Sequence, residues 1–307
     1  MDTARLQRNL AKKARAVRQL GPKGLVLEAG LRMGLGHNRQ VEQEMFGTTY
    51  IVDRRSVRDE GPGQVDMDDG WTYALIRESR VYLDVGCNVG QFALLACAQD
   101  PDRQVACIDA NPLALAVTAG NLIRNGFANR THFAAGFVSD APGQEVTFFT
   151  FGTLQGGSSH ADHAPGAQGR SMTVSTFTID QVCAGLDFTP DLMKIDVEGA
   201  EVEALWGAEA TVAAGRPRIL VEMHRVASRS MLENAQLVVD WCAGNDYEPW
   251  YLTTESRLTS AEMVEARGRC HLLLLPAGSE YPTCLVGIAQ RTSVSEVEAR
   301  ATQRSRR

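Results

Sequence analysis

Apolar and polar positions follow a regular pattern between residues 81 and 221. Short apolar runs of about four to eight residues predict strands, and apolar positions three or four apart predict amphipathic helices. Strands are expected over 81–85, 104–108, 131–138, 192–195 and 218–221, and helices over 89–99, 112–124, 178–185 and 200–213. Strands that alternate with helices in this way are typical of a mostly parallel sheet covered on both faces. The chain is therefore predicted to have an α/β fold.

The rest of the chain follows this pattern less closely. Strands over 145–151 and 171–177 flank a polar segment, 155–169. Its His160 and His163 are candidate contacts for an acceptor molecule, although a solvated insertion explains them somewhat better. Other expected elements are a short helix over 71–78 after the acidic residues Asp66, Asp68 and Asp69, a helix over 229–244, and strands over 247–252 and 270–275.

The two ends of the chain differ from its middle. Leu6, Leu10, Ala14, Val17 and Leu20 recur at helical spacing between basic residues. They predict an amphipathic helix over 3–20. The residues after 290 are polar and charged, which indicates a frayed tail. We therefore expect a helical, basic N-terminal extension over 1–60, a main domain over 61–290 and a flexible charged tail over 291–307.

The net charge of −6 hides an uneven distribution. Residues 1–40 hold nine Lys or Arg against two acidic residues, a net +7, and the last 17 residues are net +3, which leaves −16 for the residues between. An acidic body of this kind is a poor binder of nucleic acid. The basic extension is expected to pack over a substrate pocket or against a second copy of the chain, which would give a homo-oligomer.

Composition and cysteine usage narrow the class of protein further. The 307 residues are 44% hydrophobic and 22% charged, which is ordinary for a globular chain. The apolar runs are far shorter than the roughly 20 residues of a membrane-spanning helix, and the first residues lack the apolar core of a secretory signal. Seven scattered cysteines without a Cys-x-x-Cys pair indicate neither a zinc site nor a disulfide framework. We expect a cytoplasmic protein that does not contact the membrane.

The strand over 81–85 leads into a turn with two glycines four residues apart, Gly86 and Gly90. Glycine permits a sharp turn and a close approach of a ligand to the backbone. A dinucleotide fingerprint, Gly-x-Gly-x-x-Gly, needs a glycine where this chain has Asn88. S-adenosylmethionine (SAM), which has no pyrophosphate, fits this spacing better. We therefore assign Asp84, Gly86, Asn88 and Gly90 to a SAM site, and a tight turn without a ligand is the alternative.

The next two strand ends carry residues suited to the same cofactor. Asp109, with Ala110 beside it, can accept hydrogen bonds from both ribose hydroxyls, although an Asp here can also cap a helix. Val138, Ser139 and Asp140 are expected to border the adenine ring. For Asp140, an Asp-initiated turn is nearly as good an explanation.

The fourth and fifth strands end in residues that can activate a hydroxyl group. Asp196 and Glu198 follow one strand, and Glu222 and His224 end the other. Ligands bind beyond the carboxyl ends of strands in open α/β sheets. We predict that these four residues are catalytic, with His224 and Asp196 favoured as the base and Asp196 also beside the cofactor. Mg²⁺ held by the same carboxylates is the less favoured alternative, and the helix dipole explains Glu201.

Several segments keep a common order and spacing: Leu83–Gly90, Asp109–Pro112, Asn121–Gly126, Ile179-Asp180, Lys194–Glu201 and Glu222–His224. Together they resemble the FkbM family over about residues 80–225. The resemblance implies a SAM-dependent methyltransferase of class I, with a Rossmann-like, mostly parallel seven-stranded sheet. It also implies hydroxyl oxygens of secondary metabolites or sugars as acceptors. One departure is Asp109, where the family usually has Glu, a longer side chain.

The sequence therefore predicts SAM-dependent O-methylation of a small molecule. N-methylation of a small molecule or peptide, a nicotinamide-dependent oxidoreductase of the Rossmann type and a non-catalytic protein with the same fold are the alternatives. The glycine spacing argues against the oxidoreductase. Acidic residues at three strand ends argue against the non-catalytic protein.

Overall fold

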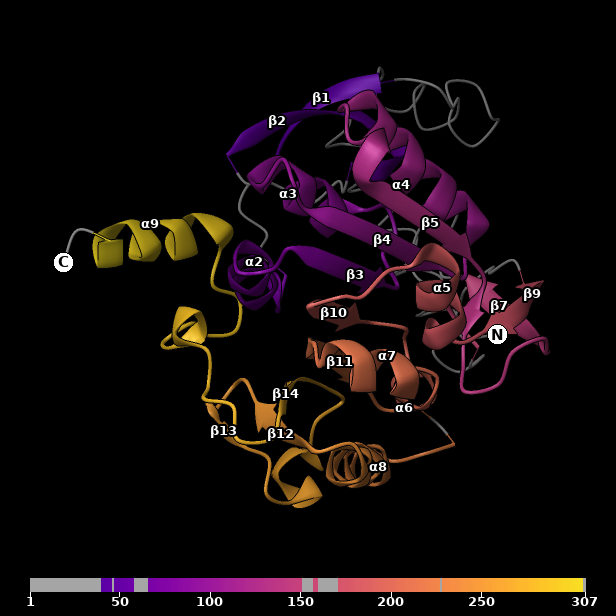
Figure 1. The fold of residues 1–307 in the computed structure, drawn as a ribbon, viewed down its shortest axis with the longest axis vertical. Helices are drawn as coiled ribbons and strands as arrows, with labels where there is room; N and C mark the ends of the chain where they lie inside the picture. Colours follow the sequence, from indigo (N-terminus) through magenta and orange to yellow (C-terminus); the bar gives the residue numbers. More distant parts are fainter. Residues whose placement is uncertain are drawn as a thin grey trace, which may run out of the picture.

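The segments predicted as strands pair into one central sheet in the computed structural model of the protein, which describes residues 40–45, 47–57, 66–150, 157–159, 171–226 and 228–305 (Figure 1). Within these residues the sheet has eight strands in the order β13-β12-β14-β11-β10-β3-β4-β5. The parallel strands are β3 (Val81–Val85), β4 (Gln104–Asp109), β5 (Thr131–Ala135), β10 (Leu192–Ile195) and β11 (Arg218–His224). Beyond β11 lie β14 (Arg269–Pro276), β12 (Tyr247–Tyr251) and β13 (Ser256–Arg257), each antiparallel to the strand before it, so that β12 again runs in the direction of β11.

This sheet confirms the α/β fold and corrects its predicted form. We expected seven strands, mostly parallel, whereas the described part of the chain forms a mixed sheet of eight, in which β14 and β13 run opposite to the other six. The difference begins at β14, where Leu272 to Leu275 are all buried. An apolar run buried on both faces looks the same whether its strand runs parallel or antiparallel to its neighbour. The pattern therefore predicts the strand but not its direction.

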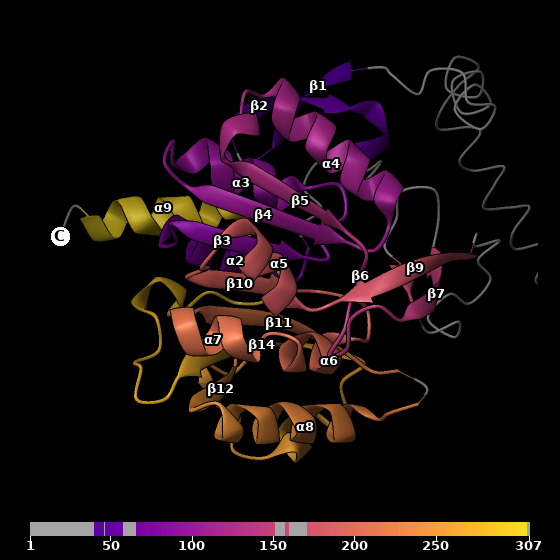
Figure 2. The same cartoon turned by 45° about the vertical axis from the view of Figure 1, so that its right-hand side comes forward.

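Helices cover both faces of the sheet, as predicted (Figures 1 and 2). The helices on one face are α2 (Asp69–Arg77), α3 (Gln91–Gln99) and α4 (Pro112–Arg124), and those on the other are α5 (Ile179–Leu186), α6 (Glu201–Trp206), α7 (Glu209–Gly215) and α8 (Met231–Gly244). Successive strand residues point to opposite faces. Tyr82 of β3 therefore joins the core under α2 and α3, while Leu83 and Val85 join the core under α5 to α8. These two cores hold the strand ends in place.

Two predicted elements are interrupted, each at a glycine. The helix expected over 200–213 divides into α6 and α7 around Gly207, where a Cβ would lie 2.2 Å from the backbone oxygen of Ser139. The strand expected over 131–138 divides at Gly136, which has a φ of +152°. Its second part leaves the central sheet for a small sheet of β6 (Phe137–Val138), β9 (Ser171–Phe177), β7 (Glu145–Thr150) and β8 (Gly157–Ser158).

The helix predicted over 3–20 lies outside the described residues. The part of the extension that is described, from residue 40, forms a hairpin of β1 (Gln40–Met45) and β2 (Thr48–Asp53), followed by a single 3-10 turn, η1 (Arg54–Ser56), rather than a long helix. Two asparagines, one in α4 and one directly after its last residue, bind this hairpin. The side chain of Asn125 accepts a hydrogen bond from the Ile51 N–H at 3.0 Å, and that of Asn121 accepts one from the Asp53 N–H at 2.7 Å. The hairpin is thereby attached to the helices on one face of the sheet.

The segment predicted as a flexible tail contains a helix, α9 (Val294–Ser305). Its Val294 and Val297 are buried in the core shared with α2, and the Tyr73 hydroxyl of α2 donates a hydrogen bond to Glu298. The expectation of a frayed tail is thus corrected, because a narrow apolar stripe docks this helix despite its charged composition. Among the described residues, no helix is both long and apolar enough to cross a membrane.

Candidate active site

The turn after β3 packs directly against the loop after β10. Gly86 and Gly90 have positive φ angles, +84° and +77°. A Cβ on Gly86 would lie 1.8 Å from the backbone oxygen of Asp196, and a Cβ on Gly90 would lie 2.5 Å from Cγ2 of Thr118. Packing of the chain alone therefore excludes a side chain at both positions. The same contact places the predicted cofactor turn beside a predicted catalytic residue.

Asn88 and Asp109 are joined across the ends of β3 and β4. The N–H of Asn88 donates to Oδ2 of Asp109 at 2.7 Å, and the N–H of Asn111 donates to Oδ1 at 2.7 Å. Burial raises the pKa of Asp109 to about 7, although these two N–H donors oppose the rise. Oδ1 of Asn88 is buried without a hydrogen-bond partner among the described residues. Both side chains therefore retain the capacity to accept hydrogen bonds from a ligand.

Asp84 lies inside the protein, beneath the glycine turn. It is buried on β3, and its direct neighbour on β10 is Lys194. Burial raises the pKa of Asp84 to about 6, and the Lys194 ammonium opposes this rise. Asp84 thus acts as a counter-charge for Lys194, and its direct contact with a cofactor stays a prediction.

The residues expected around the adenine ring are placed in different environments. Val138 is buried in the core under α5 to α8, and the Ser139 N–H donates to a carbonyl of β9 at 3.0 Å. Asp140 is exposed, and its Oδ1 accepts a hydrogen bond from Oγ of Ser139 at 3.0 Å. Ala110 is half-buried and packs on a small cluster that contains Phe137. Asp140 therefore has a local partner of the kind found in turns. His160 and His163 lie outside the described residues.

The predicted catalytic residues converge on the imidazole of His224. This residue ends β11 and is 6% exposed, with Nε2 lying 3.5 Å from Oε2 of Glu198 and 3.5 Å from Oε1 of Glu222. Donor atoms of Asp196, Glu198 and His224 lie within 4.8 Å of one another. Burial lowers the pKa of His224, but contacts with Glu201 and Glu222 outweigh burial and hold the pKa well above its usual value. The imidazole is thus placed to take up and hold a proton.

Glu201 completes this cluster, and the sequence analysis gave it no role in the site. Its Oε1 lies 2.9 Å from Nδ1 of His224 and accepts the Gly199 N–H at 2.8 Å. Glu201 is only 1% exposed, although it is the first residue of α6. A Glu at the start of a helix has a sufficient local explanation in the helix dipole. Only the fold shows that this side chain turns inward.

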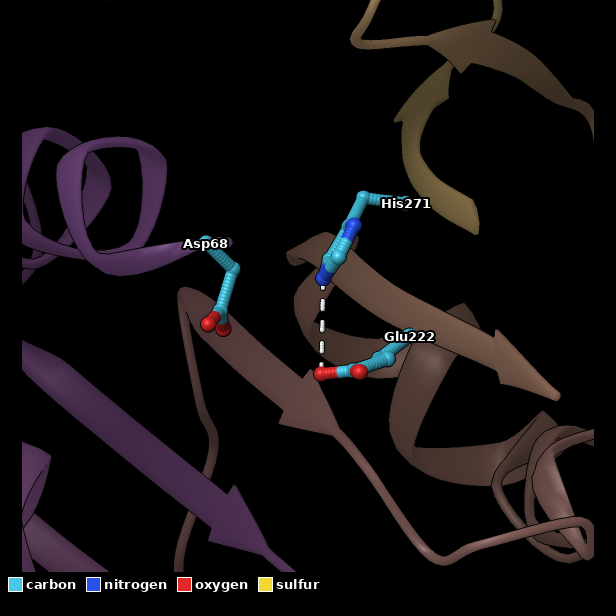
Figure 3. Close-up of side chains that lie close together, drawn as sticks. All are labelled: Asp68, Glu222 and His271. Atoms are coloured by element: carbon cyan, nitrogen blue, oxygen red, sulfur yellow. Dashed lines mark ion pairs between the residues drawn. The ribbon is translucent and has the colours of Figure 1, made fainter. Parts of the chain in front are cut away.

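Glu222 of β11 contacts residues of the adjoining antiparallel strand, β14 (Figure 3). Its Oε2 lies 3.3 Å from Nε2 of His271, and its Oε1 lies 2.6 Å from the guanidinium of Arg269. Burial raises the pKa of Glu222, but contacts with His224 and His271 hold it well below its usual value. Arg269 and His271 were not predicted as site residues. They begin an apolar strand, and they reach this strand end only because β14 runs antiparallel to β11.

Lys194 is a buried cation among carboxylates. Its Nζ lies 2.9 Å from Oδ2 of Asp196 and 3.5 Å from Oδ2 of Asp68, which precedes α2 and was also not predicted as a site residue. Burial lowers the pKa of Lys194, but Asp196 and Asp68 outweigh burial and raise it well above its usual value. Burial raises the pKa of Asp196 to about 7, and Lys194 opposes that rise. The chain thus supplies its own positive charge at the centre of the site.

In two groups of side chains, the possible ligand atoms lie close enough together to bind one divalent cation. The groups are Asp68 with Glu222 and His271 (Figure 3), and Asp196 with Glu198 and His224. Carboxylate oxygens suit Mg²⁺. Cations of the chain already pair with carboxylates in both groups, Lys194 and Arg269 in the first and Lys194 in the second. The second group is partly exposed and is the better candidate for a metal ion.

Comparison with known proteins identifies a family. The family described as the methyltransferase FkbM domain matches residues 73–248. A curated relative, the 31-O-demethyl-FK506 methyltransferase FkbM of Streptomyces tacrolimicus, is 27% identical over 179 residues, which cover 49% of this chain and 68% of that protein.

Two solved structures illustrate the similarity in three dimensions. Methyltransferase FkbM from Methylobacillus flagellatus is 18% identical with a TM-score of 0.40, and the match covers 64% of this chain and 43% of that chain. TYW2 of M. jannaschii, solved in complex with AdoMet, is 12% identical with a TM-score of 0.39, over 76% and 84% of the two chains. The present chain thus spans less than half of the M. flagellatus protein.

Proposed function

Because this chain belongs to the FkbM methyltransferase family, we propose that it transfers a methyl group from SAM to a hydroxyl oxygen of a small molecule. The observation that carries the proposal is the packing of Gly86 against the backbone of Asp196. It makes the predicted cofactor turn contiguous with the cluster around His224. Methyl transfer needs this arrangement, since the acceptor atom must contact both the methyl carbon of the donor and the group that receives its proton.

The cofactor residues in this proposal are the glycine turn and the adjoining strand ends. Asp109 accepts hydrogen bonds from the ribose hydroxyls, and Oδ1 of Asn88 supplies a further acceptor. Val138 and Ser139 border the adenine ring, with Asp140 at its edge. The contacts that fix Asp109, two N–H donors at 2.7 Å each, support this assignment because they orient the carboxylate before a ligand arrives.

SAM, when bound, supplies the methyl group and a sulfonium leaving group. The chain itself must orient the acceptor, exclude water and receive the hydroxyl proton. We assign the proton to Nε2 of His224, and we assign Glu222, Glu198 and Asp196 to orienting the acceptor and stabilising the imidazolium. General bases of this kind contribute about 10²–10⁴-fold to rate.

The acceptor atom is the finer part of the proposal. The name of the S. tacrolimicus relative specifies an O-methyl position of FK506, which supports oxygen in a secondary metabolite. A hydroxyl group also needs a base more than an amine does, and the site contains a buried histidine with three carboxylates around it. The match to a methyltransferase family argues against the alternative function, that of a nicotinamide-dependent oxidoreductase.

Calorimetry and isotope transfer test this function. The chain should bind S-adenosylhomocysteine and SAM but not NADH. With methyl-labelled SAM and a panel of hydroxylated and aminated small molecules, mass spectrometry should find the label on oxygen. Binding of NADH instead of SAM would overturn the proposal, and label found only on nitrogen would replace the acceptor.

A further inference from the structure

A buried carboxylate faces Nδ1 of His224, the ring nitrogen other than the one that lies near Glu198 and Glu222. Glu201 is 1% exposed, and its Oε1 lies 2.9 Å from Nδ1. Burial of an ionised carboxylate is unfavourable unless hydrogen bonds and a cation compensate it. Oε1 also accepts the Gly199 N–H at 2.8 Å. Oε1 of Glu201 therefore lies within hydrogen-bond distance of one backbone donor and of one nitrogen of the imidazole.

We propose that Glu201 is the positioning residue of a Glu201–His224 dyad, which makes Nε2 of His224 the proton acceptor in methyl transfer. The inference rests on the methyltransferase function proposed above and adds a residue to it. With Nδ1–H donating to Glu201, the neutral ring carries its lone pair on Nε2. That atom lies 3.5 Å from Oε2 of Glu198 and 3.5 Å from Oε1 of Glu222.

The dyad also explains where the proton and its charge go. The acceptor oxygen forms its bond to the methyl carbon as its O–H bond breaks, the proton moves to Nε2, and the electron pair of the broken C–S bond stays on sulfur. The imidazolium that results keeps its Nδ1–H bond to Glu201. Two carboxylates, Glu201 and Glu222, then stabilise one positive ring.

The surroundings of His224 fix the ring from several elements. Glu201 comes from α6, Glu198 from the loop after β10, and Glu222 from β11 itself. Asp196 follows β10 nearby, and Arg269 of β14 binds Glu222. The side-chain amide of Asn234 in α8 donates to the His224 carbonyl at 2.9 Å. Of these groups, Glu201 makes the shortest contact with the ring.

The same helix offers a matched control. Glu203 lies two residues further along α6 and pairs with Arg229 rather than with the imidazole. Glu201→Gln and Glu203→Gln each remove one negative charge from α6 without a change of size. A general loss of helix charge would affect both variants alike, whereas a dyad predicts an effect for Glu201→Gln alone.

The first readout needs no acceptor molecule. The full chain is labelled with ¹⁵N-histidine, treated with EDTA, saturated with S-adenosylhomocysteine and titrated by NMR. The variant His224→Gln, which lacks this signal, assigns it. Wild type should show the Nδ1–H tautomer of the neutral ring. Glu201→Gln should lower the pKa of His224 by about one unit or more, because a charge-assisted bond is lost. Glu203→Gln should leave tautomer and titration unchanged.

The second readout is turnover. Once an acceptor is found, Glu201→Gln should lower kcat by about 10²-fold with KM for SAM unchanged, and Glu201→Asp should restore part of it. Unchanged titration and kcat in Glu201→Gln would overturn the dyad. If Glu201→Gln does not fold, the same titration and turnover measurements are made on Glu201→Asp. Failure of wild type to bind S-adenosylhomocysteine would instead reject the methyltransferase function, and the two failures are therefore distinguishable.

Discussion

Glu222 in β11 and His271 in β14 lie directly opposite each other on neighbouring antiparallel strands, with Oε2 and Nε2 3.3 Å apart. This pair connects the five adjoining parallel strands, at whose ends most of the predicted cofactor and catalytic residues lie, to β14, which runs antiparallel to them. Both side chains are almost completely buried, and His271 also packs on Trp71 of α2. The site is therefore supported from three elements that are far apart in the sequence.

His271→Ala should destabilise the protein. It removes a partner of the buried Glu222 carboxylate and leaves space beside Trp71, so we expect a loss of about 1–3 kcal/mol in the free energy of unfolding. Urea unfolding measures it. Arg257→Ala, which breaks the exposed pair with Glu248, should cost less than about 1 kcal/mol. Equal losses in the two variants would show that His271 does not support Glu222.

Asp109→Asn should weaken cofactor binding. The ribose hydroxyls would lose a charged acceptor, and charge-assisted hydrogen bonds contribute about 1.5–3 kcal/mol each, so affinity for S-adenosylhomocysteine should fall about 10–100-fold. Calorimetry measures this change. Asp102→Asn, in an exposed turn between α3 and β4, should bind like wild type. Wild-type affinity in Asp109→Asn would remove Asp109 from the cofactor site.

Methyl transfer should increase with pH above neutrality. His224 must be unprotonated to accept a proton; burial lowers its pKa, but Glu201 and Glu222 outweigh burial and hold it above 6.5. Activity is then low below that pKa and reaches a plateau above it. The pH profile of kcat measures this rise in activity. His224→Asn should remove the rise and lower kcat by about 10²–10⁴-fold. An acidic limb that persists in His224→Asn would point to another base.

Asp84→Asn should change the pH dependence of stability. Burial raises the pKa of Asp84 from 3.8 to about 6, so the folded state holds this proton more tightly than the unfolded chain. Wild type therefore loses stability as the pH rises from about 4 to about 6, and the loss is complete above the folded-state pKa.

The variant has no such carboxyl group, so its free energy of unfolding relative to wild type should rise across that window by on the order of 2–3 kcal/mol. Urea unfolding at several pH values between about 4 and 7 measures the difference. Asp102→Asn again serves as the control and should give a flat difference. A flat difference for Asp84→Asn would mean that Lys194 fully compensates the buried charge.

Removal of divalent cations should leave turnover unchanged. Lys194 and Arg269 already pair with Asp196, Asp68 and Glu222, so the buried carboxylates have cations of the chain's own. Turnover with SAM after EDTA treatment, with and without added Mg²⁺, provides the measurement. Activity that disappears with EDTA and returns with Mg²⁺ would assign a cation to Asp196, Glu198 and His224.

The sequence predicted those parts of the molecule that local patterns determine. Pro112 after Asn111 predicts the start of α4, and the structure confirms it with the Asn111 side chain accepting the Leu113 N–H. Asp109 and His224 were identified because they end strands, and strand ends of a parallel sheet meet at one edge. Neither inference requires knowledge of distant segments.

The residues that were missed depend on distant segments. Arg269 and His271 reach the site only through the antiparallel pairing of β14, which an apolar run such as Leu272–Leu275 does not specify. Glu201 had a sufficient local explanation as the first residue of a helix. Its burial depends on how α6 packs against β11, which no short pattern encodes.

The antiparallel β14 also determines how much chain the catalytic unit requires. The family match ends at residue 248, before β14 begins at Arg269. A fragment trimmed to that boundary would expose the edge of β11 and leave Glu222 without Arg269 and His271. The smallest piece of this chain that folds cooperatively with an intact site must therefore extend at least through Pro276, well past the boundary that sequence similarity defines.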